Sequence, residues 1–370
     1  MATKTVKCPK CQHLITISGN PGEKIHLTCS KCNTQGVYTF PLDPVASTPK
    51  RQVSSSAAIE VRGLTKHFNG VKAVNNISFT VRKGEIFGFL GPNGAGKTTT
   101  IRMITTLIKP SQGRANVCGF DVLKNPIDAK KKMGFMPDVP GFYGEMKAYE
   151  VLDFYASFYK IPKKTRKEKI DELFEMMQLT EFKNRKVKTY SRGMKQKLCF
   201  ASSIINDPEL LILDEPTIGL DPATIHFFRK TLQSLNEKGV TIFLSSHILS
   251  EVQAICTKVG IINKGKIVAV DTIGALRSKT RYKGDNIVSI SYDKINDNII
   301  KIVEKIPGVL SVKNDNENKK LEIELEKNKS VIPIINKTLV ENDVAVTGIT
   351  KKEVNLEDIF LSLVGGDQNE

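Results

Sequence analysis

The segment GPNGAGKTTT, from Gly91 to Thr100, constrains the fold of this 370-residue chain more than any other feature. Its glycines free the backbone to turn N–H groups inward around phosphate, and its lysine adds a positive charge. The apolar run EIFGFL precedes the loop and TTIRMITTLI follows it, which predicts a strand, a loop and a helix in that order. The predicted phosphate loop comprises Gly91, Pro92, Asn93, Gly94, Ala95, Gly96, Lys97, Thr98 and Thr99.

Individual chemical roles follow for residues of this loop and of a second motif. Lys97 is expected to reach the β- and γ-phosphates of ATP, and Thr98 to bind Mg²⁺. The apolar run LLILDEP delivers Asp214 and Glu215 at its carboxyl end, where ligands bind parallel sheets. Asp214 fits a Mg²⁺ ligand, and Glu215 is placed to orient and deprotonate the water that attacks the γ-phosphate. The expected fold is α/β and a nucleotide is expected to bind, but this loop serves kinases, GTPases, translocases and transport motors alike.

The stretch between the two motifs indicates an inserted subdomain. Roughly 115 residues separate them, far more than one crossover connection requires, so we place a helical subdomain at about 138–205. Within it, AYEVLDFYASFYK and KEKIDELFEMMQL carry apolar residues at helical spacing. We interpret the aromatic stripe of the first helix as subdomain core, with a partner-binding surface as the alternative.

Four of the seven cysteines form two pairs near the N-terminus. Cys8 and Cys11, then Cys29 and Cys32, place four thiolates in two knuckles, a spacing that favours tetrahedral Zn²⁺. Because HLITIS and KIHLTC are typical of strands, residues 1–40 are predicted to form a zinc ribbon that needs its metal to fold. A structural or protein-docking module is favoured over a nucleic-acid-binding one. Residues 41–57, rich in Pro and Ser, are predicted to be a flexible linker.

Residues 280–370 have a different pattern from the rest of the chain. Apolar periodicity predicts strand, helix, strand, strand, helix and strand, an order typical of a ferredoxin-like α+β domain. The final stretch NLEDIFLSLVGG is predicted to be a short helix. No catalytic grouping is evident here, so support of a dimer or regulation is the expected use.

The net charge and the hydropathy of the chain indicate what it binds and where in the cell it is located. The chain carries 55 Lys and Arg against 39 Asp and Glu, a net charge of +16, which implies an acidic partner such as nucleotide, nucleic acid or anionic lipid. No run approaches the roughly 18 apolar residues of a membrane span. The start MATKTVKCPKC lacks the apolar core of a signal peptide, and a cytoplasmic location is expected.

The segment YSRGMKQKL provides a specific resemblance. Its Ser191 and Gly193 open a helix shortly before LLILDEP, and the segment resembles the signature motif of ABC-type ATPases in the form seen among exporter subunits. IGLDP, with Asp221, resembles the D-loop of that family, and His247 at the end of TIFLSSH resembles its switch histidine. The resemblance covers about residues 59–275, within a predicted ATPase domain at 58–279.

Three further positions extend or depart from this resemblance. Phe68 in KHFNG lies where the family stacks an aromatic ring on adenine, and GFMPD resembles its Q-loop. There Asp138 replaces glutamine; a carboxylate can face Mg²⁺ or the attacking water but cannot donate a hydrogen bond. Arg192 replaces the usual first glycine of the signature, which the exporter-like form tolerates because a side chain there can point outward. The ending NLEDIFLSLVGG resembles that of drug- and ion-exporter ATPases.

What the resemblance implies is a mechanism shared by two chains. In the family, two nucleotide-binding domains pack head to tail, so that ATP on the Lys97 loop of one would be capped by Ser191 and Gly193 of the other. The second domain is another copy or a similar ATPase chain. His247 would contact the γ-phosphate. Membrane-spanning permease subunits are the implied partners, which places the chain peripherally on the inner face of the cell membrane. The transported substance is determined by those partners.

Two other functions were weighed against transport. An ABC-type ATPase acting on nucleic acid or ribosomes would use the ribbon and the basic charge as contacts. Such relatives generally carry two motors in one chain or a long coiled coil, and neither is present here, so nucleic acid is not the favoured partner. A small-molecule kinase has no use for the signature serine or for Asp221.

Overall fold

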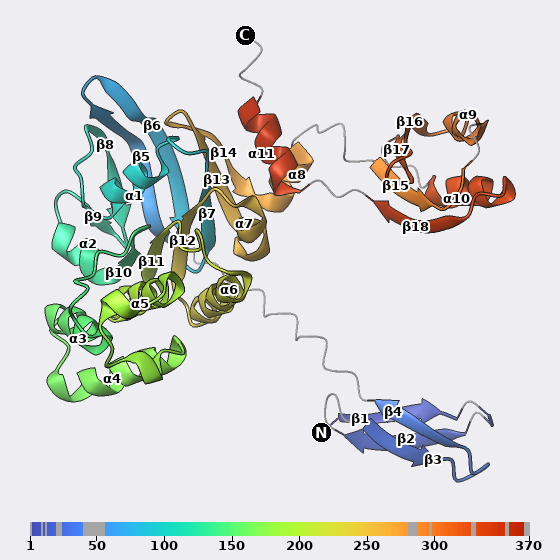
Figure 1. The fold of residues 1–370 in the computed structure, drawn as a ribbon, viewed down its shortest axis with the longest axis horizontal. Helices are drawn as coiled ribbons and strands as arrows, with labels where there is room; N and C mark the ends of the chain where they lie inside the picture. The colour runs from blue at the N-terminus through green and yellow to red at the C-terminus, as the bar shows by residue number, and fades with distance from the viewer. Residues whose placement is uncertain are drawn as a thin grey trace. The chain divides into compact units, whose positions relative to one another are not determined.

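The computed structural model describes residues 2–8, 10–11, 13–19, 24–39, 56–279, 287–295, 298–326, 331–351 and 355–365 (Figure 1). The chain divides into two compact units, Met1–Val53 and Ser54–Glu370. The linker predicted at 41–57 lies outside the described residues except for its last two positions.

The first unit consists of two antiparallel hairpins. Strand β1 (Ala2–Lys7) pairs with β2 (Leu14–Gly19), and β3 (Lys24–Thr28) pairs with β4 (Gln35–Thr39). The two CxxC pairs lie in the turns of these hairpins, Cys8 and Cys11 in the first and Cys29 and Cys32 in the second. The strands predicted at HLITIS and KIHLTC correspond to β2 and β3, and the stretch between them lies outside the described residues.

A six-stranded sheet forms the centre of the second unit. Its strand order is β10 (Met133–Met136), β11 (Leu210–Asp214), β12 (Thr241–Ser246), β7 (Ile86–Leu90), β13 (Lys258–Asn263) and β14 (Lys266–Thr272). All neighbours are parallel except β14, which is antiparallel to β13. Every residue of β7, β11 and β12 is buried, so structure covers both faces of the sheet.

One face of this sheet packs against a second, antiparallel sheet. That sheet has the order β6 (Val71–Arg82), β5 (Ala57–Phe68), β8 (Gln112–Val117) and β9 (Phe120–Asp121). Side chains alternate along a strand, and Phe87 and Phe89 of β7 therefore point to the same side as Phe243 of β12. These three rings surround Phe79, with ring centroids 5.4 to 6.0 Å from it. Helices α1 (Lys97–Ile104) and α2 (Pro126–Lys132) add apolar residues to this core.

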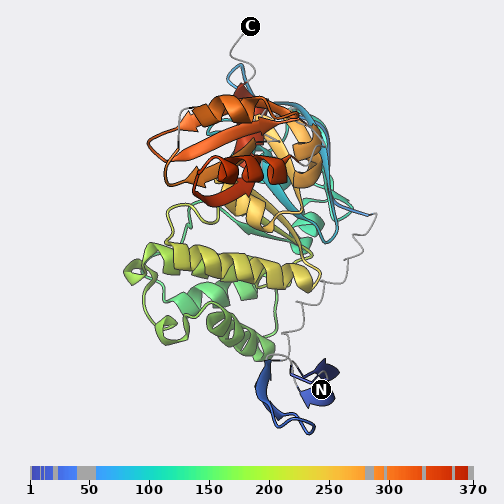
Figure 2. The same cartoon turned by 90° about the vertical axis from the view of Figure 1, so that its right-hand side faces the viewer.

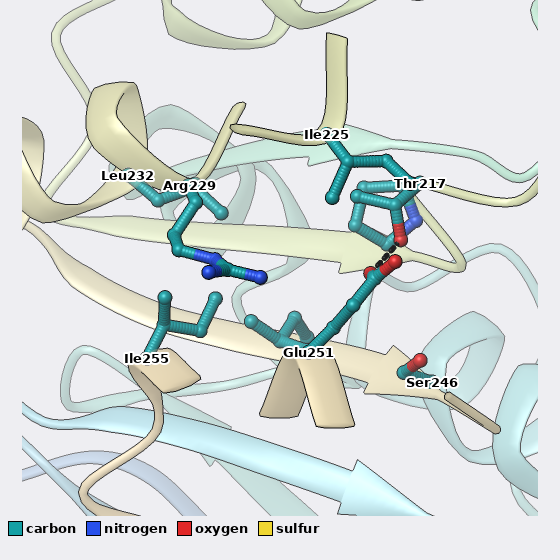
Figure 3. A pocket seen from close by; sticks show the side chains of 9 residues that line it. Thr217, Ile225, Arg229, Leu232, Ser246, Glu251 and Ile255 are labelled. Carbon is teal, nitrogen blue, oxygen red and sulfur yellow. Dashed lines mark hydrogen bonds between the residues drawn. The ribbon is translucent and has the colours of Figure 1, made fainter. Parts of the chain in front are cut away.

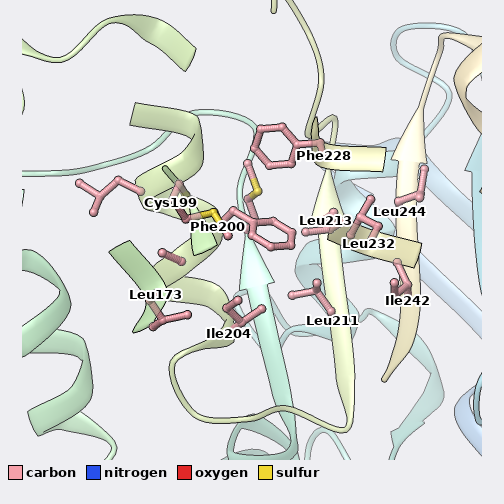
Figure 4. Packing of buried hydrophobic residues seen from close by; sticks show 14 of the residues in the cluster. Leu173, Cys199, Phe200, Ile204, Leu211, Leu213, Phe228, Leu232, Ile242 and Leu244 are labelled. Carbon is pink, nitrogen blue, oxygen red and sulfur yellow. The ribbon is translucent and has the colours of Figure 1, made fainter. Parts of the chain in front are cut away.

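Helices cover the opposite face of the central sheet. Phe200 of α5 (Arg192–Ile204) meets Phe228 of α6 (Pro222–Glu237) edge to face, with ring centroids 5.3 Å apart (Figure 4). Helices α3 (Ala148–Phe158) and α4 (Lys163–Met176) join the same apolar cluster, together with two 3₁₀ turns, Thr180–Phe182 and Val187–Thr189. Figure 2 shows α3 and α4 in green beside α6, at one end of this unit. The helical insertion is thus found between β10 and β11.

The remaining elements follow the central sheet in sequence. Helices α7 (Leu249–Ile255) and α8 (Ile273–Lys279) precede a four-stranded antiparallel sheet of order β16, β17, β15, β18. Along the chain its elements are β15 (Ile287–Tyr292), α9 (Asn298–Glu304), β16 (Val309–Asp315), β17 (Lys320–Leu325), α10 (Ile332–Glu341) and β18 (Val346–Lys351). This is the strand and helix order predicted from the sequence.

The last helix, α11 (Leu356–Gly365), packs against α7 and α8. Its Leu356 and Ile359 are completely buried in the cluster that also contains Val252 of α7. The backbone N–H of Leu356 donates to Oε1 of Gln253 at 2.9 Å, which satisfies one donor at the start of the helix. Helix α11 therefore contributes to the apolar core on the helical face of the central sheet.

Candidate functional site

The loop after β7 is pressed closely against its surroundings. A Cβ atom on Gly91 would lie 2.3 Å from the carbonyl oxygen of Ile262, and one on Gly96 would lie 2.6 Å from that of Ala73. Gly96 also has a φ of +105° at the start of α1, a conformation that side chains rarely adopt. Only glycine allows the loop to curve so tightly at these two points.

Lys97 is held beneath this loop. Its side chain is 6% exposed, and Nζ donates to the carbonyl oxygens of Gly91 at 2.8 Å and Pro92 at 3.3 Å. Nζ also lies 3.4 Å from Oε1 of Glu215, as an ion pair. The ammonium group is therefore positioned between the phosphate loop and the acid that ends the neighbouring motif.

The two carboxylates after β11 have different environments. Asp214 is buried, and its Oδ1 accepts hydrogen bonds from Ser245 at 2.6 Å and from Thr98 at 3.4 Å. Burial raises the pKa of the Asp214 carboxyl above its usual range, and the two hydroxyl donors oppose that shift only in part. A cation would stabilise a carboxylate in this setting, and the hydroxyl of Thr98 beside it would be a second oxygen ligand.

Glu215 faces the cavity in a constrained conformation. Its φ of +49° lies in the left-handed region, which is unusual for a residue with a long side chain. Oε2 is 2.9 Å from Nδ1 of His247, and the backbone N–H donates to Ser245 Oγ at 3.0 Å. Glu215 thus joins Lys97 on one side and His247 on the other.

A cavity of about 400 Å³ joins the predicted site residues. It brings together the loop and the residues expected from three later motifs, and it is lined by Asn93, Gly94, Gly96, Lys97, Thr98, Thr99, Asp138, Glu215 and His247. Four further lining residues were not predicted from the sequence: Ala73, Val139, Arg192 and Ile218. Phe68, at the end of β5, is 46% exposed and does not line this cavity.

The remaining predicted residues lie at two helix starts. The hydroxyl of Ser191 accepts a hydrogen bond from the backbone N–H of Met194 at 3.2 Å and caps α5. Asp221 caps α6 in the same way, through Thr224 N–H at 2.9 Å. Gly193 lies in the first turn of α5. Both helix starts are exposed, so their unpaired N–H groups are accessible to a ligand from outside the chain.

Arg192 makes a contact that was not predicted from the sequence. Its residue is exposed, and its guanidinium reaches back over the turn that follows Glu215. Its Nη2 donates to the carbonyl oxygen of Ile218 at 2.9 Å. The spacing of the signature motif contains no signal for this contact, because it depends on how α5 and α6 pack.

A second, small pocket lies behind the same turn. Figure 3 shows Thr217 and Glu251 joined by a hydrogen bond, with Arg229 and Leu232 of α6 extending over the pocket. Glu251 belongs to the first turn of α7, which follows His247. This hydrogen bond therefore links the turn after Glu215 to α7, the helix that follows His247.

The four paired cysteines of the first unit converge. Their sulfur atoms all lie within 4.8 Å of one another, and Cys8–Cys32 and Cys11–Cys29 are both 3.6 Å apart. A tetrahedral zinc with bonds of about 2.3 Å would separate its sulfur ligands by about 3.8 Å, so the cluster has a suitable size. Hydrogen bonds from Thr34 lower the pKa of the Cys32 thiol to about 6, which favours the thiolate form that binds metal. His13 contacts Ser30 instead, at 3.2 Å.

Comparison with known proteins gives consistent matches. The family model described as ABC transporter matches residues 74–218, and the model described as ATP-binding protein DrrA1-3-like, C-terminal domain, matches residues 278–364. The chain is 37% identical to the uncharacterized ABC transporter ATP-binding protein YhcH of Bacillus subtilis, over 84% of this chain and 97% of that protein. It is also 37% identical to the bacitracin transport ATP-binding protein BcrA of Bacillus licheniformis, over 84% and 98%.

Solved structures resemble the ATPase part. A structure titled as the ATP binding subunit of an ABC transporter is 29% identical with a TM-score of 0.57, and it covers 60% of this chain and 92% of its own. The dimeric structure of MJ0796, a bacterial ABC transporter cassette, has a TM-score of 0.54 at 23% identity, over 58% and 98%. The latter likeness concerns the fold alone.

Proposed function

This chain belongs to the ABC transporter ATP-binding proteins, and we propose that it hydrolyses ATP to drive export through separate membrane-spanning subunits. Such proteins are ATPases that power transport. Export is supported by relatives such as the bacitracin transport protein and the linearmycin resistance ATP-binding protein LnrL of Bacillus subtilis, which is 33% identical over 98% of its length. Within the described residues, no helix combines the length and apolar content that a membrane crossing requires.

The observation that carries this proposal is the arrangement of three side chains at one cavity. Glu215 lies 3.4 Å from Lys97 and 2.9 Å from His247, beside a loop that only glycines allow. In the proposed reaction, Lys97 binds the β- and γ-phosphates of ATP and breaks its ion pair with Glu215. The carboxylate of Glu215 is then free to accept a proton from water. His247 orients that carboxylate and contacts the γ-phosphate. Phe68 stacks on adenine.

Mg²⁺ fits the residues at the edge of this cavity. Asp214 provides a buried carboxylate in need of positive charge, and Thr98 provides a hydroxyl 3.4 Å away. Asp138 lines the same cavity and is a third candidate ligand. When bound, Mg²⁺ neutralises the charge that develops on the phosphates. The role of the protein is to hold these oxygens on two adjacent elements, the start of α1 and the end of β11.

We infer that two ATPase domains act together. The exposed starts of α5 and α6, with Ser191, Gly193 and Asp221, are available to the ATP of a second copy or of a similar chain. Backbone N–H groups at a helix start favour the extra charge of the γ-phosphate. ATP would then hold the two domains together, and hydrolysis would release them.

We further propose roles for the two accessory parts. The cysteine cluster is a zinc site, and residues 1–40 are a zinc ribbon that docks protein rather than nucleic acid. The βαββαβ order with strand order β16, β17, β15, β18 supports a ferredoxin-like domain within residues 280–370. We place the protein on the cytoplasmic face of the membrane, bound to permease subunits.

Affinity purification in gentle detergent tests this proposal. The full chain should recover a membrane protein with several spans, and ATP hydrolysis by the complex should exceed that of the chain alone. Glu215→Gln should bring down the same partner without hydrolysis. Recovery of RNA or DNA that is lost at higher salt, with no membrane protein, would contradict transport.

A further inference from the structure

The turn that carries Glu215 is strained and needs support. Glu215 has a φ of +49°, and Gly219, four residues later, has a φ of +68°. Within the turn, the hydrogen bond from the N–H of Ile218 to the carbonyl of Glu215 is long, at 3.4 Å. A residue in an unfavourable backbone region keeps its conformation only when its surroundings fix it. The contacts that hold this turn therefore determine where the catalytic carboxylate lies.

Side chains from outside the turn supply those contacts, beginning with Ser245, whose Oγ accepts a hydrogen bond from the N–H of Glu215 at 3.0 Å. Gln196 is buried and donates from Nε2 to the carbonyl of Pro216 at 3.3 Å, and Arg192 donates to the carbonyl of Ile218 at 2.9 Å. Thr217 is bonded to Glu251 of α7. Gln196 and Arg192 lie one turn apart on α5, the helix that begins at the signature motif. One helix thus holds two of the carbonyl groups that follow Glu215.

Arg192 fits the turn in a way that depends on glycine. A Cβ atom on Gly219 would lie 2.6 Å from the guanidinium carbon and from one of its nitrogens. The guanidinium therefore lies directly on the backbone of the turn. Arg192 also lines the cavity that contains Glu215 and His247 of the same chain. An exposed arginine that bends back this far is held by its contacts, since the free side chain has many other rotamers.

We propose that Arg192 is a positioning residue that fixes the Glu215 turn of its own chain. This inference rests on the proposed role of Glu215 in hydrolysis. If the start of α5 meets the ATP of a second copy, Arg192 connects the nucleotide bound there to the catalytic acid of its own site. The competing arrangement is a direct contact of Arg192 with the phosphates of the second copy. In the first arrangement, loss of Arg192 impairs the ATP site of its own chain. In the second arrangement, it impairs the ATP site of the other chain.

Single variants test whether Arg192 supports catalysis. Arg192→Ala should lower kcat about tenfold, the effect of losing one such hydrogen bond at the transition state, with the KM for ATP unchanged. Arg192→Lys keeps a donor and should restore part of kcat. Lys230→Ala, which removes a charge from the exposed face of α6, is the control and should match wild type. Full kcat in Arg192→Ala, or a rise in KM with kcat unchanged, would overturn the proposal.

Mixed dimers, purified with two different tags, separate the two arrangements. When Arg192→Ala and Glu215→Gln share one chain and the other chain is wild type, the only active Glu215 retains its own Arg192, and activity should persist. When the two changes are on opposite chains, activity should fall about tenfold. The reverse result would show contact with the second copy and would refute positioning in the same chain. Full turnover by the Glu215→Gln homodimer would instead refute the proposed function.

Discussion

Asp214 is the residue whose setting is least favourable without a cation. It is 2% exposed, and burial raises the pKa of its carboxyl. The folded state therefore binds a proton at this position more tightly than the unfolded state does. By linkage, the ionised carboxylate costs folding free energy at neutral pH, and this cost disappears as pH falls below the raised pKa. The Mg²⁺ proposed to bind here would offset this cost.

Asp214→Asn should separate these two effects. Without Mg²⁺ at pH 7, the variant should unfold at an equal or higher temperature than wild type, and the difference should shrink as pH is lowered. Its ATP hydrolysis with Mg²⁺ should fall about a hundredfold or more, because charge stabilisation at the phosphates is lost. Thermal unfolding measures the change in stability, and steady-state turnover measures the change in ATP hydrolysis. A variant that unfolds earlier than wild type at pH 7 would contradict the account of Asp214.

Residues identified by spacing alone were the easiest to predict. Glycines, lysine and threonine at fixed intervals identify the phosphate loop because local backbone geometry demands them, and the cavity collects Lys97, Thr98 and Glu215 as expected. The position of Arg192 could not be predicted. Its partner Ile218 lies 26 residues away, and the contact exists only once α5 and α6 have packed on the sheet.

Among the elements, α11 is the one whose sequence position least suggests its packing. It follows a separate antiparallel sheet, yet Leu356 and Ile359 enter the core around α7. Ile359→Ala should destabilise this part of the molecule by roughly 3 kcal/mol, the usual cost of a cavity at a fully buried isoleucine. Leu361→Ala, on the same helix but 60% exposed, is the matched control. Chemical unfolding of both variants measures the difference, and equal stability would refute the docking of α11.

The cysteine hairpins make a second prediction at this scale. Protein purified with zinc should contain about one zinc per chain, and Cys8→Ser should lose most of it because two ligands remain on one hairpin and only one on the other. Cys118→Ser, outside the cluster, is the control. Turnover of ATP should survive in Cys8→Ser, since the ATPase part belongs to a separate unit. Equal zinc in wild type and Cys8→Ser, measured by elemental analysis, would exclude this site.

Helices and strands with a strong apolar pattern were predicted well, but the elements that they pack against were not. The runs EIFGFL, LLILDEP and TIFLSSH became adjacent buried strands because each has apolar side chains on both faces. The six-element order of the C-terminal part was also read from alternation. The stacking of Phe79 on Phe243, and the contact of α11 with α7, connect elements far apart in sequence. No local pattern encodes such pairings.

For the whole molecule, the decisive feature of the proposed mechanism is that the signature helix and the phosphate loop act on different ATP molecules. The loop, Glu215 and His247 surround one cavity, while Ser191 and Asp221 cap exposed helix starts. In the proposed mechanism, a complete ATP site needs both sets, and a second copy or a similar chain supplies the missing one. Transport then depends on the cycle of association and release.

The mass of the Glu215→Gln protein in solution tests this cycle most directly. Light scattering after size exclusion should give a dimer with ATP and Mg²⁺ and a monomer with ADP, because only ATP retains the γ-phosphate that joins the two domains. Adding Ser191→Ala should weaken the dimer. A protein that stays monomeric with ATP, while the wild-type chain hydrolyses ATP at full rate as a monomer, would contradict the account.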